Sequence, residues 1–408
     1  MQNNPWVKDF PILAADENGN RLVYLDSAAT TQHPTQVLDA VTNYYLHDNA
    51  NPHRGVYELA MRATDAHEGA RHRVAQFFHA QDDEIVFTQN TTESLNLVAY
   101  SYGLSHLKAG DEIAVTIMEH HSNLLPWQMV ARQTGAELKF MECETDGTLT
   151  DETIQTVINE KTKLVAVAQV SNVLGCVNPI EKIVARAHEV GAVVVMDGAQ
   201  SVPHMPVDVQ KLDVDFMAFS GHKLMGPMGI GVLYGRKVLL EEMPPFLTGG
   251  EMIDSVTREG AVFAELPYKF EAGTVNAAGA AGLAAAIDYL NQVSFDFIQE
   301  QELALTQRAM EGLAKVPHVH VMGSEDPANH TGIVSFTVEG VHPHDVSEIL
   351  ASDGIDVRAG HHCAQPLLTY LGVHSSTRAS FMFYNTLDEV DAFVKSVASI
   401  RRRMGYEE

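Results

Sequence analysis

The chain has 408 residues, 45% of them hydrophobic and 20% charged, which is enough apolar sequence for the cores of two or three domains and is not typical of disorder. With 53 acidic and 27 basic side chains it carries a formal net charge of −26, and the resulting field argues against nucleic acids and anionic membranes as partners. No apolar run approaches the roughly 18 residues of a membrane span, residues 1–8 lack the pattern of a signal peptide, and the three cysteines cannot form a disulfide framework, so we expect a cytoplasmic protein.

Short β-branched runs alternate with helical patterns from about residue 20 to residue 285. The runs predict strands at 23–25, 84–87, 112–116, 164–168, 193–196, 216–219 and 231–234, and the patterns between them predict helices at 34–46, 64–78, 92–107, 124–133 and 179–189. Several of these strands are apolar throughout, as in a sheet that is covered on both faces. The alternation predicts a mainly parallel, doubly wound α/β domain with its ligand site at the carboxyl ends of the strands.

The pattern changes after Ala277. A long helical region is predicted at 280–313, a pair of strands around 319–321 and 333–336, a helix near 345–350 and a final helix at 387–404. These elements indicate a second, smaller α+β domain. We therefore expect a large domain over residues 21–285 and a small domain formed by residues 1–20 together with 286–408.

Lys223 directly follows the predicted strand 216–219 in the segment Ser-Gly-His-Lys, and Asp197 ends the predicted strand 193–196. Such a pair at strand ends is what an enzyme needs to hold pyridoxal phosphate, because the lysine forms the Schiff base and the aspartate pairs with the pyridinium nitrogen. Alone the pattern is weak, since a lysine at a strand end is more often a solvated surface cation.

Residues 88–93 follow the predicted strand 84–87 and open a helix. Backbone N–H groups and the hydroxyls of Thr91 and Thr92 therefore converge where a phosphate could bind, and Ser220 and His222 would add donors from the opposite side. A capping box, threonine followed by glutamate, explains the same residues without a ligand. The two interpretations are compatible.

The segment 119–123, Glu-His-His-Ser-Asn, follows the predicted strand 112–116. One imidazole here would stack on a planar cofactor ring and shuttle protons, if pyridoxal phosphate is bound. A metal site and a polar loop are the alternatives. Adjacent histidines point in different directions and no third ligand has suitable spacing, so the sequence disfavours a metal.

Ten segments, in chain order, resemble the group II cysteine desulfurases of the SufS/CsdA type, in the class V aminotransferase branch of fold type I pyridoxal-phosphate enzymes. They are residues 25–29, 51–55, 91–93, 119–121, 171–173, 197–200, 220–223, 271–274, 358–365 and 378–380. The resemblance implies a homodimer with its active site near the subunit interface. It also implies conversion of L-cysteine to L-alanine, with delivery of the sulfur as an enzyme persulfide to iron–sulfur cluster assembly.

The same resemblance implies a role for each matching residue. Lys223 is similar to the Schiff-base lysine, Asp197 to the partner of the pyridinium nitrogen and Gln200 to the residue that bonds the phenolic oxygen of the ring. His120 resembles the histidine that stacks on that ring. Phosphate ligands are implied at Thr92, Ser220 and His222, joined by Thr274 of the partner subunit; Asn172 and Arg378 hold the substrate carboxylate, and Arg358 helps to position the substrate.

Cys363 separates this prediction from a generic aminotransferase, because the implied reaction needs a thiolate that attacks the substrate sulfur, with Lys223 carrying the proton. We expect Arg358, His361 and His362 to be cationic neighbours that favour the thiolate. A packed small hydrophobe is the usual state of cysteine, but Gly360, Pro366 and the polar neighbours indicate an exposed, constrained loop. A selenocysteine lyase of the same fold is the alternative function, and a non-catalytic assembly protein is the third.

The short interval between Arg358 and Cys363 resembles the short-loop group II pattern, in which sulfur passes to an acceptor of the SufE or SufU kind that enters the site. Residues 341–345 are similar to the branch that uses the zinc-containing SufU, so His344 is a predicted acceptor contact. A helix start capped by Asp345 explains this segment equally well. The chain departs from the family pattern at positions 89–90, 225 and 275.

Overall fold

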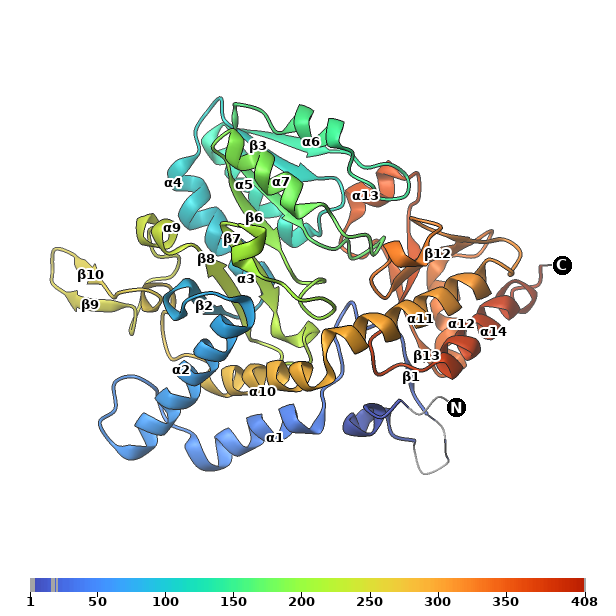
Figure 1. Cartoon of the computed structure of the whole chain (residues 1–408), viewed down its shortest axis with the longest axis horizontal. Helices are drawn as coiled ribbons and strands as arrows, with labels where there is room; N and C mark the ends of the chain where they lie inside the picture. Colours follow the sequence, from blue (N-terminus) through green and yellow to red (C-terminus); the bar gives the residue numbers. More distant parts are fainter. Residues whose placement is uncertain (1–3, 16–18, 20, 407–408) are drawn as a thin grey trace.

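The computed structural model describes residues 4–15, 19 and 21–406. The chain forms a larger α/β part around a seven-stranded sheet and a smaller part around a four-stranded sheet (Figure 1). Among the described residues, no helix is long and apolar enough to cross a membrane.

The large sheet has the strand order β2-β8-β7-β6-β5-β3-β4. Its members are β2 (Ile85–Thr88), β3 (Glu112–Thr116), β4 (Glu137–Met141), β5 (Thr162–Ala168), β6 (Val193–Asp197), β7 (Phe216–Ser220) and β8 (Gly231–Gly235). Every neighbouring pair is parallel except those of β8, which runs antiparallel to β2 and β7. The predicted α/β class with a mainly parallel sheet is confirmed.

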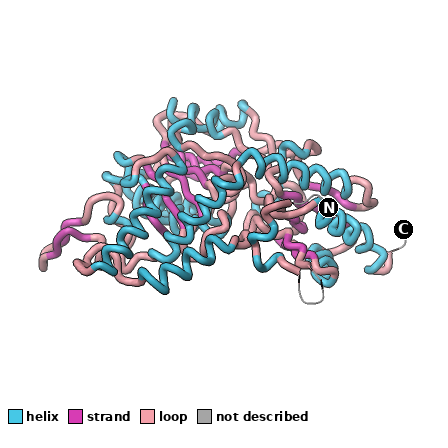
Figure 2. The backbone as a smooth tube through the Cα atoms, turned by 60° about the horizontal axis from the view of Figure 1, so that its bottom comes forward, coloured by secondary structure: helices cyan, strands magenta, loops and turns pink. Residues whose placement is uncertain are grey.

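Helices cover both faces of this sheet, as the tube in Figure 2 shows. The helices of the larger part are α1 (Thr35–Asn43), α2 (Glu58–Phe78), α3 (Thr91–Leu97), α4 (Leu104–His106), α5 (Leu125–Thr134), α6 (Asp151–Val157), α7 (Ile180–Glu189), α8 (Val209–Leu212), α9 (Lys237–Glu242) and α10 (Ala277–Val293), of which α1 packs on α10. Alternate residues of β5 point to opposite faces: Leu164 and Ala166 lie in one hydrophobic core, Val165 and Val167 in the other. A central strand between two cores explains its continuous apolar sequence.

The smaller part has an antiparallel sheet in the order β11-β12-β15-β14. Its elements are β11 (Val319–Val321), β12 (Ile333–Val338), β14 (Arg358–Gly360), β15 (Ser376–Ser380), α11 (Phe295–Leu313), α12 (Pro343–Ser352), α13 (Gln365–Tyr370) and α14 (Leu387–Arg403). The predicted helix 280–313 is wrong in one respect, because it breaks at Ser294. This residue has a φ of 74° and its hydroxyl caps α11 by accepting from Phe297 N, which separates α10 from α11.

The first predicted strand does not join the large sheet. Val23–Tyr24 forms β1, which pairs in parallel with β13 (Ile355–Asp356) beside the smaller sheet. Leu25 packs into the core of the smaller part, and Asp26 forms a bridge with Ser380. The domain boundaries given above remain a prediction, but this pairing brings the segment after β1 to the junction of the two parts.

A hairpin that the sequence did not predict projects from the large part. It consists of β9 (Ile253–Val256) and β10 (Ala261–Phe263), and Figure 1 shows it extending away from the rest of the molecule.

A buried ion pair joins α2 to the loop before α10. Both side chains are almost inaccessible, and Arg71 donates to the two carboxylate oxygens of Glu271 at 2.7 and 2.8 Å. Glu271 also accepts from Phe87 N and Arg71 donates to Ile85 O, so the pair holds β2 as well. Burial alone would raise the pKa of Glu271, but Arg71 lowers it to about 2.

Arg71→Met is therefore expected to lower the free energy of unfolding by about 3–5 kcal/mol, because it leaves a buried carboxylate without its counter-charge. Urea unfolding measures the change. The control is Arg308→Met, which breaks the exposed Arg308–Asp391 pair and should cost about 1 kcal/mol or less. Equal losses in the two variants would show that the buried pair does not have the role given to it here.

Candidate active site

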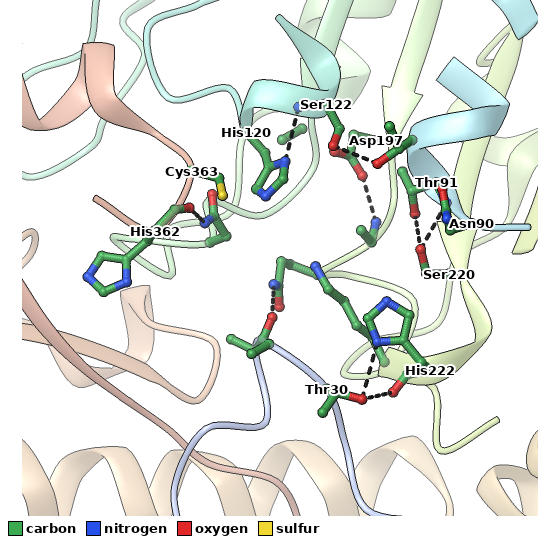
Figure 3. Close-up of a pocket in the computed structure, with 18 of the residues that line it drawn as sticks. Thr30, Asn90, Thr91, His120, Ser122, Asp197, Ser220, His222, His362 and Cys363 are labelled. Carbon is green, nitrogen blue, oxygen red and sulfur yellow. Dashed lines mark hydrogen bonds between the residues drawn. The ribbon is translucent and has the colours of Figure 1, made fainter. Parts of the chain in front are cut away.

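A cavity of about 590 Å³ opens at the carboxyl ends of the strands of the large sheet, and residues of the smaller part close one side of it (Figure 3). Most of the residues singled out from the sequence line it: Thr91, Thr92, His120, Asn172, Asp197, Gln200, Ser220, His222, Lys223, Arg358, Cys363 and Arg378. The structure thus brings together twelve of the fourteen site residues that the sequence predicted. Thr274 and His344 do not line it.

Lys223 and Asp197 lie at the ends of neighbouring strands, since β6 ends at Asp197 and β7 leads into the turn Gly221–Lys223. Burial lowers the pKa of Lys223 to about 8, although Asp197 opposes that shift. Burial also raises the pKa of Asp197, whose carboxylate accepts from Ala199 N at 2.9 Å. The interpretation of Lys223 as a solvated surface cation is therefore wrong. Near neutral pH its amine is available as a nucleophile or proton carrier.

His120 directs its ring into the cavity from the turn after β3, as Figure 3 shows. Its Nδ1 accepts from Ser122 N at 3.1 Å, so the proton of the neutral ring is on Nε2. Burial, with a further contribution from Lys223, lowers the pKa of His120 to about 3. At neutral pH this ring is an uncharged surface for stacking, with one N–H donor.

Hydroxyl groups gather along the wall of the cavity that begins beside His120. Ser220 Oγ lies 2.7 Å from Thr91 Oγ1 and accepts from Thr91 N at 2.8 Å, and Thr92 Oγ1 lies 2.7 Å from the hydroxyl of Ser122. The helix cap is Asn90, whose Oδ1 accepts from Glu93 N at 3.0 Å. The expected capping box with threonine at its head is therefore wrong. Because Asn90 caps α3, the threonine hydroxyls are left to face the cavity.

The segment after β1 completes this side. Gln200 Nε2 donates to Ala28 O at 2.8 Å, and His222 Nδ1 lies 3.2 Å from Thr30 Oγ1. Burial and the nearby Lys223 lower the pKa of His222 to about 4, so its ring is neutral. Thr30 lines the cavity and was missed from sequence because it lies one residue beyond the segment 25–29 that carries the family resemblance.

Two arginines share one carboxylate where the smaller part meets the cavity. Arg358 Nη2 donates to Asp26 Oδ2 at 2.7 Å, and Arg378 Nη2 lies 3.5 Å from Asp26 Oδ1. Arg378 is buried and donates to Asn172 O at 2.8 Å, while its buried Nε has no hydrogen-bond partner among the described residues. Burial lowers the pKa of Arg378 to about 10, so it stays charged. Two cations against one anion leave a net positive site that suits a ligand carboxylate.

The loop that carries Cys363 is exposed and constrained. Gly360 has a φ of 128°, and His362 and Cys363 both have left-handed backbones with φ of 53° and 54°. Two hydrogen bonds of 2.6 Å hold this conformation: Asn172 Nδ2 donates to His362 O, and His121 N donates to Cys363 O. A non-glycine residue in this region is strained, and such strain persists only where the surroundings fix it.

The other two thiols differ from Cys363, which is exposed. Cys143 and Cys176 are buried, and burial raises their pKa values to about 11 and 12. Both stay protonated at neutral pH and are poor nucleophiles. Cys363 is therefore the one thiol of the three in a position to react with a ligand in the cavity.

The expectation that His362 is a cationic neighbour of the thiol is wrong. Its ring is buried and its Nε2 lies 2.9 Å from Ser376 Oγ. Burial and Arg378 lower the pKa of His362 to about 3, and Figure 3 shows the ring directed away from Cys363. The positive charge near the thiol comes from Arg358 and Arg378.

These neutral histidines make the protein sensitive to acid. The ordinary histidine pKa is 6.5, whereas those of His120, His222 and His362 are about 3, 4 and 3 when the chain is folded. Between about pH 6.5 and pH 4 the unfolded chain binds protons that the folded chain does not, so the free energy of unfolding falls as the pH drops through this window. Urea unfolding at several pH values should show a shallower fall for His362→Gln than for the unchanged protein. His344→Gln, which replaces an exposed histidine, should leave the slope unchanged; equal slopes in all three would contradict the prediction.

The two remaining predicted residues lie on the surface. Thr274 is exposed in the loop before α10. His344 is exposed in the first turn of α12, whose cap is His342: its Nδ1 accepts from His344 N at 3.2 Å. The alternative interpretation, a helix start capped by Asp345, is therefore wrong about the capping residue, although a helix does start here.

The residues of the cavity fit pyridoxal phosphate. A cavity of this volume holds a ligand of that size. The amine of Lys223, with its pKa of about 8, suits the aldehyde of the cofactor, and the buried carboxylate of Asp197 suits the pyridine nitrogen. The hydroxyls of Thr91, Thr92 and Ser220 supply donors for the phosphate.

Comparisons with known proteins agree with this site. Residues 23–393 match the family described as class V aminotransferases, and the chain therefore belongs to that family. A probable cysteine desulfurase of Halalkalibacterium halodurans is 51% identical over 400 residues, 98% of each chain. The structure of an apo cysteine desulfurase from Thermococcus onnurineus NA1 superimposes with a TM-score of 0.94 at 44% identity over 99% of each chain. That of the cysteine desulfurase CsdA (S-sulfonic acid) from Escherichia coli gives 0.90 at 41% identity, also over 99% of each chain.

A more distant structure shows the cofactor itself. It is a variant of C-DES with glycine covalently linked to its pyridoxal-phosphate cofactor, with a TM-score of 0.83 at 25% identity over 96% of this chain and 99% of the other. The predicted family and fold type are confirmed by these matches.

Proposed function

We propose that the protein is a pyridoxal-phosphate-dependent cysteine desulfurase, which converts L-cysteine to L-alanine and retains the sulfur as a persulfide on Cys363. The observation that carries this function is the meeting of Lys223, Asp197 and His120 with the exposed Cys363 in one cavity. An aminotransferase site needs the first three but no thiol. The names of the relatives support the same activity.

The cofactor, when bound, supplies an electron sink conjugated to the α-carbon of the amino acid. Lys223 would attach the cofactor and would carry a proton at Nζ, which its pKa of about 8 permits near neutral pH. The carboxylate of Asp197 would pair with the pyridine nitrogen and favour its protonated form. The neutral ring of His120 would hold the cofactor ring by stacking and exclude water there.

The substrate is oriented by its carboxylate. Arg378 and the amide of Asn172 hold this group, and Arg358 lies beside them. The buried Nε of Arg378 is free to donate to it, since no partner occupies this atom in the part of the chain that the structure describes. Since Asn172 also donates to His362 O, the same side chain links the carboxylate site to the loop of the nucleophile.

The thiolate of Cys363 then attacks the sulfur of the substrate. A sulfur–sulfur bond forms, the carbon–sulfur bond breaks, and the electron pair of that bond passes to the substrate carbon skeleton. Lys223 Nζ returns the proton that it took from the α-carbon, and the proton lost by the Cys363 thiol supplies the second, which completes L-alanine. Arg358 and Arg378 place positive charge near this sulfur.

The test is incubation of the purified holoenzyme with L-cysteine and a reducing thiol. Equal amounts of alanine and sulfide are expected. Turnover of selenocysteine with no alanine from L-cysteine would replace this function by that of a selenocysteine lyase, and no product from either would refute it.

A homodimer is part of the proposal. Apolar side chains are exposed on the segment that joins α1 to α2 and on the start of α2, namely Tyr45, Leu46, Val56, Tyr57 and Met61, and Val56 is 95% exposed. A second copy of the chain would cover them. Thr274, which is exposed and does not line the active-site cavity of its own chain, would then reach the phosphate in the partner's site.

The sulfur acceptor is proposed to be a protein of the SufU or SufE type that serves iron–sulfur cluster assembly in the cytoplasm, where thiols stay reduced. Helix α12 packs against β14, which leads to Cys363, and it presents the exposed His344. His344 is therefore a proposed contact of an acceptor that approaches the thiol from this side.

A further inference from the structure

A buried carboxyl group lies beneath the cavity and has no role in the proposed function. Glu119 is 1% exposed and accepts three hydrogen bonds. Thr116 Oγ1 and Ala168 N donate to its Oε1 at 2.5 and 3.0 Å, and Asn123 Nδ2 donates to its Oε2 at 2.6 Å. Among the described residues, no salt bridge includes this side chain.

These contacts join the elements that carry the cofactor residues. Thr116 ends β3 and Ala168 ends β5, next to Asp197 in the register of the sheet. Asn123 also accepts from Trp127 Nε1 at 3.0 Å, which extends the network into α5. One carboxyl group therefore ties two strand ends and a helix together.

The same network holds His120. Asn123 N donates to His120 O at 2.8 Å, and Ser122 N donates to His120 Nδ1. The turn that fixes this ring is thus anchored through the side chain of Asn123, whose orientation is fixed by Glu119 on one side and Trp127 on the other.

A carboxyl group suits this position better than an amide. The three groups that face it are donors, and the Asn123 amide cannot turn over because its oxygen accepts from Trp127. A glutamine at position 119 would direct its N–H₂ group at one of these donors. One buried donor would then be left without an acceptor, which is destabilising. Burial raises the pKa of Glu119 to about 8, so its carboxyl group holds a proton near neutral pH. This single O–H can turn to the hydroxyl oxygen of Thr116, which accepts as well as donates, whereas the N–H₂ group of an amide has two hydrogens and no free lone pair.

We infer that Glu119 is a positioning residue, which acts through Asn123 and the turn after it to hold the ring of His120 flat against the cofactor. The inference rests on the proposed function, because it concerns the cofactor ring. On this inference, the stacking geometry of His120 is set by Glu119, the residue directly before it in the chain.

The test compares Glu119→Gln with the unchanged holoenzyme. Displacement of the His120 ring is expected to lower kcat by about tenfold with KM within about twofold, because a misplaced group costs rate while the carboxylate site is intact. The visible absorption and ellipticity of the bound cofactor should change with it. A role in stability alone would lower the melting temperature and leave these spectra unchanged, which would overturn the inference.

A double-mutant cycle with His120→Ala decides whether Glu119 acts through His120. In that background Glu119→Gln should change kcat by less than about twofold, and a persistent tenfold fall would overturn the inference. The matched control is Glu302→Gln, which alters another buried carboxyl group, paired with His204 and outside the cavity, and should leave the spectra unchanged. A spectral change there as large as that of Glu119→Gln would also overturn it.

Trp127→Phe serves if Glu119→Gln does not fold. It removes the N–H that fixes Asn123 and leaves Glu119 in place, so a smaller spectral change in the same direction is expected and an unchanged spectrum would contradict the inference. The unchanged protein distinguishes failure of the proposed function from failure of this inference. If the unchanged protein shows no cofactor spectrum and forms no alanine, the proposed function itself is wrong.

Discussion

Lys223→Ala is expected to lower the turnover of L-cysteine by on the order of 10⁴-fold, because one amine both attaches the cofactor and carries the proton. Its environment fits both roles, since burial brings its pKa to about 8 and Asp197 lies at the end of the next strand. The variant should still bind the cofactor through the hydroxyls of Thr91, Thr92 and Ser220, but without a covalent link. Steady-state kinetics and borohydride reduction followed by mass measurement check the two results.

The matched control for this prediction is Lys223→Arg, which retains a cation but cannot give up its proton at neutral pH. It should be as inactive as the alanine variant. Turnover in the arginine variant comparable to that of the unchanged protein would show that charge alone is required and that the amine is not a proton carrier.

Cys363→Ala is expected to lower sulfur release from L-cysteine by on the order of a hundredfold or more, because no other thiol reaches the substrate. The cofactor spectrum should stay as it is, since Cys363 lies on the loop after β14 and not on the elements that hold the cofactor. Assays of alanine and sulfide give the first result and absorption spectroscopy the second.

Cys143→Ala and Cys176→Ala are the controls, because both thiols are buried and protonated. Neither substitution should change turnover by more than about twofold. Full activity of Cys363→Ala, or a loss confined to one of the buried thiols, would contradict the persulfide mechanism.

The central strands of the large sheet were predictable because the apolar pattern that marks them lies within each strand. Burial on both faces demands apolar residues at every position, as in β5 and β7, and this reads directly from the sequence. The edge strand β4 was missed because its first half is not fully buried, so that Glu137 and Lys139 interrupt its apolar pattern. The break at Ser294 was missed because a positive φ at serine is set by packing and not by its propensity.

The cavity residues at strand ends were predictable for a related reason. Parallel strands place their carboxyl ends at one edge, so polar residues such as Asp197 and His120 that follow apolar runs meet there. Asp26 was missed as a partner of Arg358 and Arg378, because β1 pairs with β13 and not with the large sheet. The charge of His362 was also wrong, since its burial against Ser376 depends on a contact that sequence spacing does not give.

The central claim is that substrate sulfur becomes attached to Cys363, and peptide mass measurement after one turnover tests it most directly. The holoenzyme is mixed with L-cysteine in the absence of a reducing thiol or an acceptor, quenched and digested. The account predicts a gain of one sulfur atom, about 32 Da, on the peptide that contains Cys363 and on no peptide with Cys143 or Cys176. Alanine formed in equal amount to the enzyme while the Cys363 peptide keeps its original mass would contradict it.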